Sequence, residues 1–243
     1  MQVARAFSTV NSAEIAHFSR LSSQWWDERG EFSFLHQMNP ARMQFIRSKL
    51  LEIARDEGNE HSDANVLHNL DILDVGCGGG LLSEASNQIS KVQRHSHFLQ
   101  SLARLGARTL GIDASDANIA IAKHHASLDT KLAHKLSYSA CQAERLVNEA
   151  QRYDVVCSME VLEHVDHPVQ FLKTCSELLK VILLHSYLKF LILFCSHPVI
   201  FSFPPSHAHH CHISSPFLWQ KKSCARSLLV HILTPNLSNL QSS

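Results

Sequence analysis

The stretch ILDVGCGGGLLSE, residues 72–84, decides the fold. Its aliphatic run, which extends back to Leu70, predicts a buried parallel strand that ends at Gly76. The glycines that follow, up to Gly80, predict a tight turn with positive φ angles, across which a ligand can approach the backbone closely. We expect a helix to begin near Leu81, so that its first, unpaired N–H groups face that ligand.

Strand and helix patterns alternate on the C-terminal side of this stretch. The predicted strands are residues 107–113, 135–141 and 152–158, and the predicted helices are residues 115–129 and 167–180. On the N-terminal side we expect one helix over residues 13–26 and a second that begins at Asn39 and Pro40. The alternation predicts an α/β fold with a doubly wound, Rossmann-like parallel sheet.

Acidic residues flank the glycine turn in a particular pattern. Asp74 starts the sequence Asp-x-Gly-x-Gly-x-Gly, which differs from the Gly-x-Gly-x-x-Gly of dinucleotide folds. Asp113 ends the second predicted strand, where a carboxylate can accept hydrogen bonds from both ribose hydroxyls. The alternative is a flexible turn followed by a helix-capping aspartate. The arrangement resembles the first motif of S-adenosylmethionine (SAM)-dependent class I methyltransferases, whose glycine loop cradles the amino-acid end of the cofactor.

Four segments narrow the resemblance to one family. They are WWDERGEFSFLHQMNPAR, ILDVGCGGGLLSE, SLARLGARTLGID and YDVVCSMEVLEHVDHP. Together they resemble the ubiquinone-biosynthesis O-methyltransferases, which methylate a catechol hydroxyl of polyprenylated dihydroxybenzoate and of demethylubiquinol. The match covers about residues 8–180 with one interruption. It implies SAM as cofactor and Arg42, Gly76, Asp113 and Met159 as the residues that contact it.

These assignments agree with the chemistry of the side chains. Arg42 can pair with the methionine carboxylate of SAM, and Met159 can pack against adenine. Without the resemblance, a solvated helix charge and a core methionine would be the simpler interpretations of these two residues.

The segment EVLEH supplies candidate catalytic groups. Glu160, Glu163 and His164 have the spacing i, i+3 and i+4, so one turn of α-helix would place them on the same face. Carboxylate oxygens suit Mg²⁺, and a bound cation would lower the pKa of a phenol from about 10. The resemblance implies the same three residues as magnesium ligands. The alternative is a metal-free site in which His164 is the general base.

Composition divides the chain into unequal parts. Residues 1–12 resemble a mitochondrial presequence, and residues 13–180 form the predicted methyltransferase domain, with an atypical insertion at residues 85–100. No glycine follows Gly111 and no acidic residue follows Glu177, so residues 181–243 are expected to be a non-homologous, disordered tail. We therefore expect the C-terminal strands of the sheet to be missing and the fourth strand to be an edge.

The tail and the insertion have the composition of retained introns or gene-model read-through. Two other interpretations of the tail are a membrane anchor over residues 181–194 and a metal-binding tract over residues 207–212. Neither agrees as well with the loss of the family pattern after residue 180.

Charge and cysteine content limit the remaining functions. Lys and Arg number 22, as do Asp and Glu, so no net charge indicates a nucleic-acid partner. The seven cysteines form no C-x-x-C pair and are expected to be reduced, mostly buried thiols. The resemblance implies a prenylated phenolic substrate, peripheral association with the matrix side of the mitochondrial inner membrane, and a multi-enzyme complex. The alternatives are a methyltransferase of another small phenol or acid, and an inactive, truncated chain that only binds partners.

Overall fold

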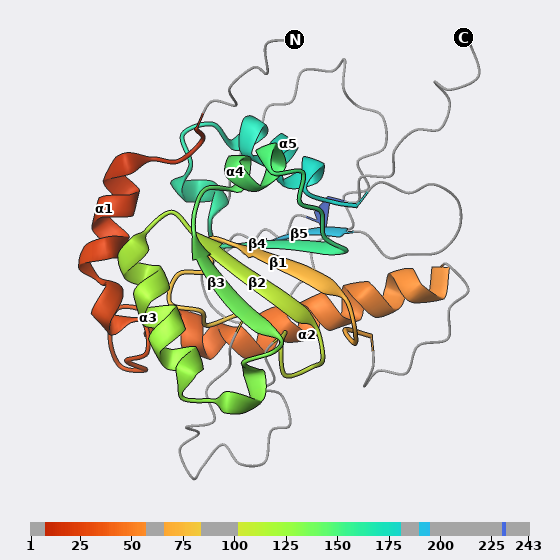
Figure 1. Cartoon of the computed structure of the whole chain (residues 1–243), viewed down its shortest axis with the longest axis horizontal. Coiled ribbons are helices and arrows are strands. Elements are labelled where there is room, and N and C mark those ends of the chain that lie inside the picture. Colours follow the sequence, from red (N-terminus) through yellow and green to blue (C-terminus); the bar gives the residue numbers. More distant parts are fainter. Residues whose placement is uncertain (1–7, 57–65, 84–101, 181–189, 195–229, 232–243) are drawn as a thin grey trace, which may run out of the picture.

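The computed structural model describes residues 8–56, 66–83, 102–180, 190–194 and 230–231 (Figure 1). Its centre is a six-stranded sheet with the order β3-β2-β1-β4-β5-β6. The strands are β1 (Asp71–Val75), β2 (Arg108–Asp113), β3 (Leu136–Ala140), β4 (Val155–Met159), β5 (Phe190–Phe194) and β6 (Val230–His231). All pairings are parallel except that of β5 with β6. The predicted Rossmann-like α/β sheet is confirmed, with β1 near its middle.

Helices cover both faces of this sheet. They are α1 (Ser12–Arg20), α2 (Ser33–Asp56), α3 (Asp116–Ser127), α4 (Ala143–Asn148) and α5 (Pro168–Glu177), with 3₁₀ turns η1 (Ser22–Gln24), η2 (Thr130–Leu132) and η3 (Leu162–His164). Side chains of β1 alternate between the faces: Ile72 packs in the cluster that α2 supplies, and Leu73 packs in the cluster of α4 and α5. Figure 1 shows α2 crossing one face while α4 and α5 lie over the other.

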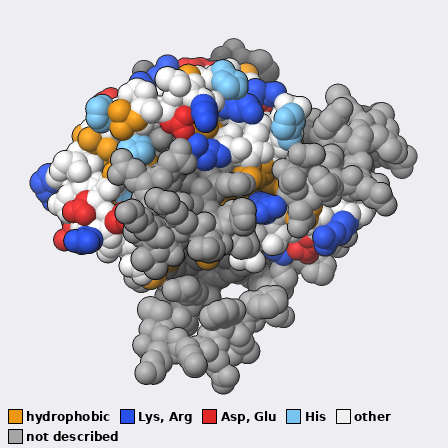
Figure 2. All heavy atoms as spheres, turned by 90° about the horizontal axis from the view of Figure 1, so that it is seen from below, with side chains coloured by type: hydrophobic (Ala, Val, Ile, Leu, Met, Phe, Trp, Pro, Cys, Tyr) orange, Lys and Arg blue, Asp and Glu red, His pale blue; other side chains and the backbone are white. Residues whose placement is uncertain are grey.

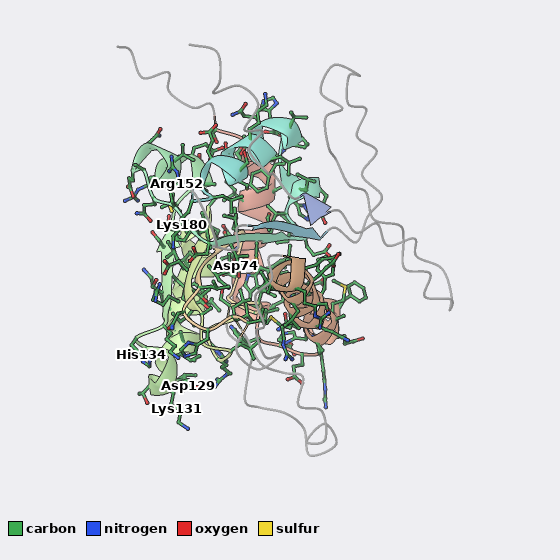
Figure 3. All side chains as sticks on the ribbon, turned by 90° about the vertical axis from the view of Figure 1, so that its right-hand side faces the viewer. Asp74, Asp129, Lys131, His134, Arg152 and Lys180 are labelled. Atoms are coloured by element: carbon green, nitrogen blue, oxygen red, sulfur yellow. The ribbon has the colours of Figure 1, made fainter. Side chains whose placement is uncertain are left out.

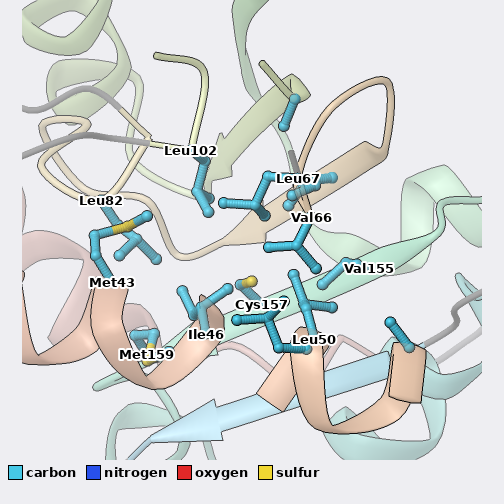
Figure 4. Packing of buried hydrophobic residues seen from close by; sticks show 14 residues of the cluster. Met43, Ile46, Leu50, Val66, Leu67, Leu82, Leu102, Val155, Cys157 and Met159 are labelled. Carbon is cyan, nitrogen blue, oxygen red and sulfur yellow. The ribbon is translucent and has the colours of Figure 1, made fainter. Parts of the chain in front are cut away.

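The α2 face holds the larger core cluster. Ile46 and Leu50 of α2 have no exposed surface and pack with Val155 and Cys157 of β4 (Figure 4).

Cys77, Cys157 and Cys175 are buried free thiols, and burial raises the pKa of each. Three of the four cysteines in the described residues are therefore buried, as predicted, while their reduced state stays a prediction. On the outer surface of this side, Lys, Arg, Asp and Glu side chains are interspersed (Figure 2), which agrees with the balanced composition.

The prediction that β4 would be an edge strand is wrong. β5 pairs with it in parallel from Val155 opposite Phe190 to Met159 opposite Phe194. The segment Phe190–Phe194 reads FLILF, and aromatic and β-branched residues of this kind favour strands. Two elements of the predicted disordered tail therefore extend the sheet, and part of the hypothetical membrane anchor is a strand. The rest of that tail and the insertion at residues 85–100 lie outside the described residues.

The start of α2 also differs from the prediction. The helix begins at Ser33 and continues through Pro40, and Asn39 is not its cap. Proline inside a helix costs about 3 kcal/mol, but α2 buries Met43, Ile46 and Leu50 against the sheet, and this burial offsets the cost. Within the described residues, no helix is long and apolar enough to cross a membrane.

The glycine stretch leads into turns. Gly78 to Ser83 form turns, where we expected a helix from Leu81, and Glu84 lies outside the described residues. The unpaired N–H groups of a helix start are therefore not part of the described loop.

Residues that precede α1 pack on the domain. Thr9 is 2% exposed and its Oγ1 donates to Glu144 Oε1 at 2.7 Å. Val10 forms a β-bridge with Val165. The end of the predicted presequence at residue 12 stays a prediction, but residues 9–11 belong to the folded unit described here.

Candidate functional site

Two cavities meet at Gly76, at the carboxyl ends of β1, β2 and β4. The larger, about 360 Å³, is lined by Gly76, Gly78 and Asp113. The smaller, about 30 Å³, is lined by Gly76, Arg42 and Met159. The four residues expected to contact the cofactor therefore surround one point of the fold. This is the edge at which open parallel sheets bind their ligands.

The glycine turn is shaped by the protein's own side chains as well as by any ligand. Gly76 has φ +74° and Gly78 has φ +54°, a region that residues with a Cβ rarely adopt. A Cβ on Gly76 would collide with Val161, and one on Gly78 would collide with the ring of Trp25. The glycine pattern by itself predicts only that these positions admit a ligand. They also admit Trp25 and Val161.

Trp25 is a site residue that the sequence reasoning missed. Its ring stacks on Phe32 with centroids 3.8 Å apart, and its Nε1 donates to Asn118 Oδ1 at 2.9 Å. The same ring lines both cavities. The signal was present in the Trp-Trp-Asp segment, but nothing in that segment shows which strand end the indole reaches.

Asp113 is held by hydrogen bonds from three directions. Its Oδ2 accepts from Gly78 N at 3.0 Å, and its Oδ1 accepts from Ser115 N at 2.8 Å and Asn118 Nδ2 at 3.3 Å. Burial raises the pKa of this carboxyl, while the donors from Ser115 and Gly78 oppose the rise. A carboxylate has about four acceptor positions, so ribose hydroxyls would compete with, or join, these protein donors.

Arg42 is a buried cation beside the glycine turn. It is 4% exposed, and its Nη2 donates to Asn39 Oδ1 at 2.8 Å. Its buried Nε has no hydrogen-bond partner in the described structure. Burial lowers the pKa of this guanidinium, and the charges of Asp74 and Glu160 oppose that shift. An unused donor on a buried arginine is what a carboxylate ligand would satisfy.

Asp74 lies inside the molecule, away from surface groups such as Arg152 and His134 (Figure 3). Ser83 Oγ donates to its Oδ2 at 2.6 Å. Burial raises its pKa to about 6, although the Ser83 hydrogen bond and the charge of Arg42 act against the rise. Arg42 and Asp74 are therefore buried groups of opposite charge that influence each other's pKa, and both line the smaller cavity.

The smaller cavity has room for about one water molecule. The methionine end of SAM would therefore enter only if a wall moves, and Trp25, Leu35 and Leu81 form part of that wall. Met159 has two roles: it lines this cavity and, at 5% exposed, packs in the α2 cluster. The residues present fit SAM in charge and in position, provided that a wall of the smaller cavity moves outward to admit it.

Glu160, Glu163 and His164 all line the larger cavity. The α-helical turn predicted for them is wrong, because Leu162–His164 form the 3₁₀ turn η3 and Glu160 precedes it with φ +58°. Their i, i+3, i+4 spacing therefore does not give a shared helical face. In the parts of the chain that the structure describes, no three His, Cys, Asp or Glu side chains are grouped so as to hold a metal ion. The described geometry does not fit the magnesium site implied by the resemblance.

His164 instead contacts the N-terminal helix. Its Nδ1 lies 2.8 Å from Glu14 Oε2, and its ring packs edge-on against Phe18 with centroids 5.0 Å apart. Glu14 and Phe18 line the larger cavity together with His164. The pattern of residues 13–26 predicts a helix here but does not indicate that the helix contributes to the site.

Comparisons with known proteins agree with this geometry. A methyltransferase-domain family matches residues 34–210. The mitochondrial ubiquinone biosynthesis O-methyltransferase of Mus musculus is 41% identical over 174 residues, 71% of this chain and 42% of that protein. The Arabidopsis thaliana protein of the same name is 40% identical over 70% of this chain and 47% of its own length. The ubiquinone biosynthesis O-methyltransferase of Bartonella tribocorum is 38% identical over 71% of this chain and 61% of its own length.

The chain spans about half the length of the curated relatives it matches. The predicted resemblance to ubiquinone-biosynthesis O-methyltransferases is confirmed by these relatives. The family match covers most of the chain and includes the glycine turn, Asp113 and the η3 turn. The chain belongs to the methyltransferase-domain family.

Proposed function

We propose that this chain is a SAM-dependent O-methyltransferase that methylates a catechol hydroxyl of polyprenylated dihydroxybenzoate and of demethylubiquinol. One observation carries the proposal: Arg42, Gly76, Asp113 and Met159, which are far apart in the sequence, surround one point at the carboxyl edge of the sheet. The names of the relatives support the substrate class.

The chain's own residues would bind the cofactor from two sides. Asp113 would accept hydrogen bonds from the ribose hydroxyls, and the buried Arg42 would pair with the carboxylate of the methionine end. Met159 would contact the adenine. When bound, SAM supplies a methyl carbon that is made electrophilic by its sulfonium sulfur.

His164 is the residue best placed to take a proton from the acceptor. A phenol has a pKa near 10 and must lose its proton as its oxygen attacks. His164 Nε2 would receive that proton as the acceptor oxygen takes the methyl group that SAM would supply, and the cavity wall would hold the acceptor oxygen toward that group. Since Nδ1 of the ring faces Glu14, Nε2 is the nitrogen that remains for this task.

The magnesium site that the resemblance implies, with Glu160, Glu163 and His164 as ligands, stays a prediction. Such an ion would lower the pKa of the phenol and orient the catechol. These three residues share the cavity wall, but the described geometry does not group them around one point. The metal-free base is therefore the better supported of the two.

We also propose a mitochondrial location, on the matrix side of the inner membrane. The names of the mouse and Arabidopsis relatives support it, as do Arg5 and Arg20 in the N-terminal segment, while bacterial relatives match equally well. A prenylated substrate would favour peripheral association with the membrane and with other enzymes of the same pathway.

A methyl-transfer assay tests the proposal and separates the two mechanisms. The 243-residue chain is incubated with SAM that carries a labelled methyl group and a polyprenylated dihydroxybenzoate, with EDTA or with Mg²⁺. We expect labelled product in both conditions. Activity that disappears in EDTA and returns with Mg²⁺ would support the metal site, and the absence of product in both conditions would support the inactive alternative.

A further inference from the structure

A third cavity lies at the amino ends of the strands, at the opposite edge of the sheet from the glycine turn. Its volume is about 260 Å³, and its lining includes Asp71 and Arg108, the first residues of β1 and β2, and Arg152, which precedes β4. A strand rises about 3.3 Å per residue, so roughly 15 Å separates Asp71 from Gly76 along β1. The cavity is therefore distinct from the proposed cofactor site.

The charged side chains of this cavity are mostly basic. Arg108, Lys135 and Arg152 bring three positive charges, and among the described residues of the lining Asp71 brings the one negative charge. The lining therefore has a net charge of +2, in a chain whose basic and acidic residues are equal in number. In Figure 3, Arg152 and His134 lie on the same side of the molecule, and both belong to this lining. A hollow lined by charges of one sign concentrates ions of the opposite sign.

Asp71 does not neutralise the remaining positive charges. Its Oδ1 accepts from Arg108 Nε at 2.6 Å, and its Oδ2 accepts from Lys180 Nζ at 2.7 Å. Arg152 Nη1 donates to the backbone oxygen of the preceding residue at 2.7 Å. In the described part of the chain, no carboxylate forms an ion pair with Arg152 or Lys135. Two cations of the lining are thus available to an anion.

The buried part of the lining is mostly apolar. Leu136 and Tyr153 are 9% and 8% exposed, and Leu110 is partly buried. The hydroxyl of Tyr153 donates to Gln151 Oε1 at 2.6 Å, which fixes the position of the ring. An apolar base with a few charged groups around it is typical of a site for a small organic molecule.

We propose that this cavity binds a small organic molecule that carries a phosphate group, with the phosphate held by Arg152 and Lys135 and the apolar body against Tyr153. A guanidinium can donate two parallel hydrogen bonds to phosphate oxygens. A phosphate monoester carries a charge of about −1.5 to −2 at neutral pH, which matches the charge of the lining. The site is independent of methyl transfer.

Calorimetric titration of the 243-residue chain with phenyl phosphate tests the proposal. Inorganic phosphate is the comparison, because it supplies the anion without an apolar body. We expect saturable binding at one site, with a lower Kd for phenyl phosphate because its ring covers apolar surface. SAM should not displace phenyl phosphate. Displacement by SAM would place the anion at the cofactor site and overturn the proposal.

Two substitutions should change this affinity in opposite directions. Arg152→Gln removes a cation and should raise the Kd for phenyl phosphate at least about 10-fold, whereas Asp71→Asn removes the acidic group and should lower it about threefold or more. A general loss of stability would not produce opposite effects, and circular dichroism melting curves show that each variant is folded. The matched control is Lys131→Gln, at an exposed lysine on the same side of the molecule but outside the lining (Figure 3). Its Kd should stay within about twofold of that of the unsubstituted chain.

Three results would overturn the proposal. The first is the absence of saturable binding of phenyl phosphate to the folded chain. The second is equal weakening by Arg152→Gln and Lys131→Gln, which would show that general surface charge attracts the anion. The third is binding to vesicles that contain an anionic phospholipid without any binding of phenyl phosphate, which would assign these basic residues to a membrane surface.

Discussion

Replacing Asp113 by alanine should weaken the binding of SAM. In the proposed complex this carboxylate accepts hydrogen bonds from the ribose, and hydrogen bonds to a charged group are worth about 1.5–3 kcal/mol. The change also removes the acceptor for Gly78 N and Ser115 N, which hold the glycine turn and the start of α3. We therefore expect the dissociation constant for SAM to rise by roughly 10-fold to 150-fold.

The matched control is Asp116→Ala. Asp116 lies three residues further on, in the first turn of α3, and is exposed. It carries the same charge but lines neither cavity. Its loss should cost only the favourable interaction of an acid with a helix start, about 0.3–1 kcal/mol of stability, and should leave SAM affinity within about twofold.

Isothermal titration calorimetry of the 243-residue chain and both variants measures the effect, with circular dichroism melting curves to show that each variant is folded. An unchanged affinity in folded Asp113→Ala would remove Asp113 from the cofactor site. Equal weakening by Asp116→Ala would show that general charge, and not the ribose contact, is responsible.

Two further substitutions test the local physics of the site. Gly78→Ala places a Cβ at φ +54° against the ring of Trp25, and it should lower the free energy of unfolding, measured by urea titration, by about 1–3 kcal/mol. The control is Gly30→Ala, at a glycine without positive φ. Equal destabilisation by both substitutions would show that the positive φ of Gly78 and its contact with Trp25 have no special effect. Asp74 has a pKa of about 6 in the folded chain against an ordinary 3.8, so its contribution to stability is fully present below pH 4 and falls by roughly 3 kcal/mol as the pH rises to about 6. Asp74→Asn should therefore flatten the pH dependence of unfolding between pH 4 and 6, and an unaltered slope there would mean that Asp74 is ionised normally.

The sheet, and the carboxyl ends of its strands as the place of the cofactor, could be predicted from short-range patterns. The aliphatic run before Gly76 and the placement of Asp113 at the end of a strand are both local, and parallel strands bring such ends together without further information. Arg42 and Met159 were assigned only through the resemblance, because nothing in their immediate neighbours distinguishes a ligand contact from a helix charge or a core side chain.

Other features could not be predicted because distant contacts decide them. Asn39 and Pro40 have the local signature of a helix start, but burial of apolar side chains along α2 extends the helix back to Ser33. The residues FLILF have strand propensity, but β5 forms only through its pairing with β4, and a tail without glycines and acids gives no local sign of that pairing. The contact of Glu14 with His164 joins residues 150 positions apart, and no local pattern specifies such a pairing.

The product of the reaction tests the central claim most directly. The 243-residue chain is incubated with SAM and a polyprenylated dihydroxybenzoate, and the product is identified by mass spectrometry and by its stability to mild alkaline hydrolysis. The account predicts one added methyl group, as an aryl ether that survives hydrolysis, and loss of this product in His164→Gln. A hydrolysable methyl ester would show that the acceptor is a carboxylate, and no methylated product from folded, SAM-binding protein would contradict the assignment of this chain as a phenol O-methyltransferase.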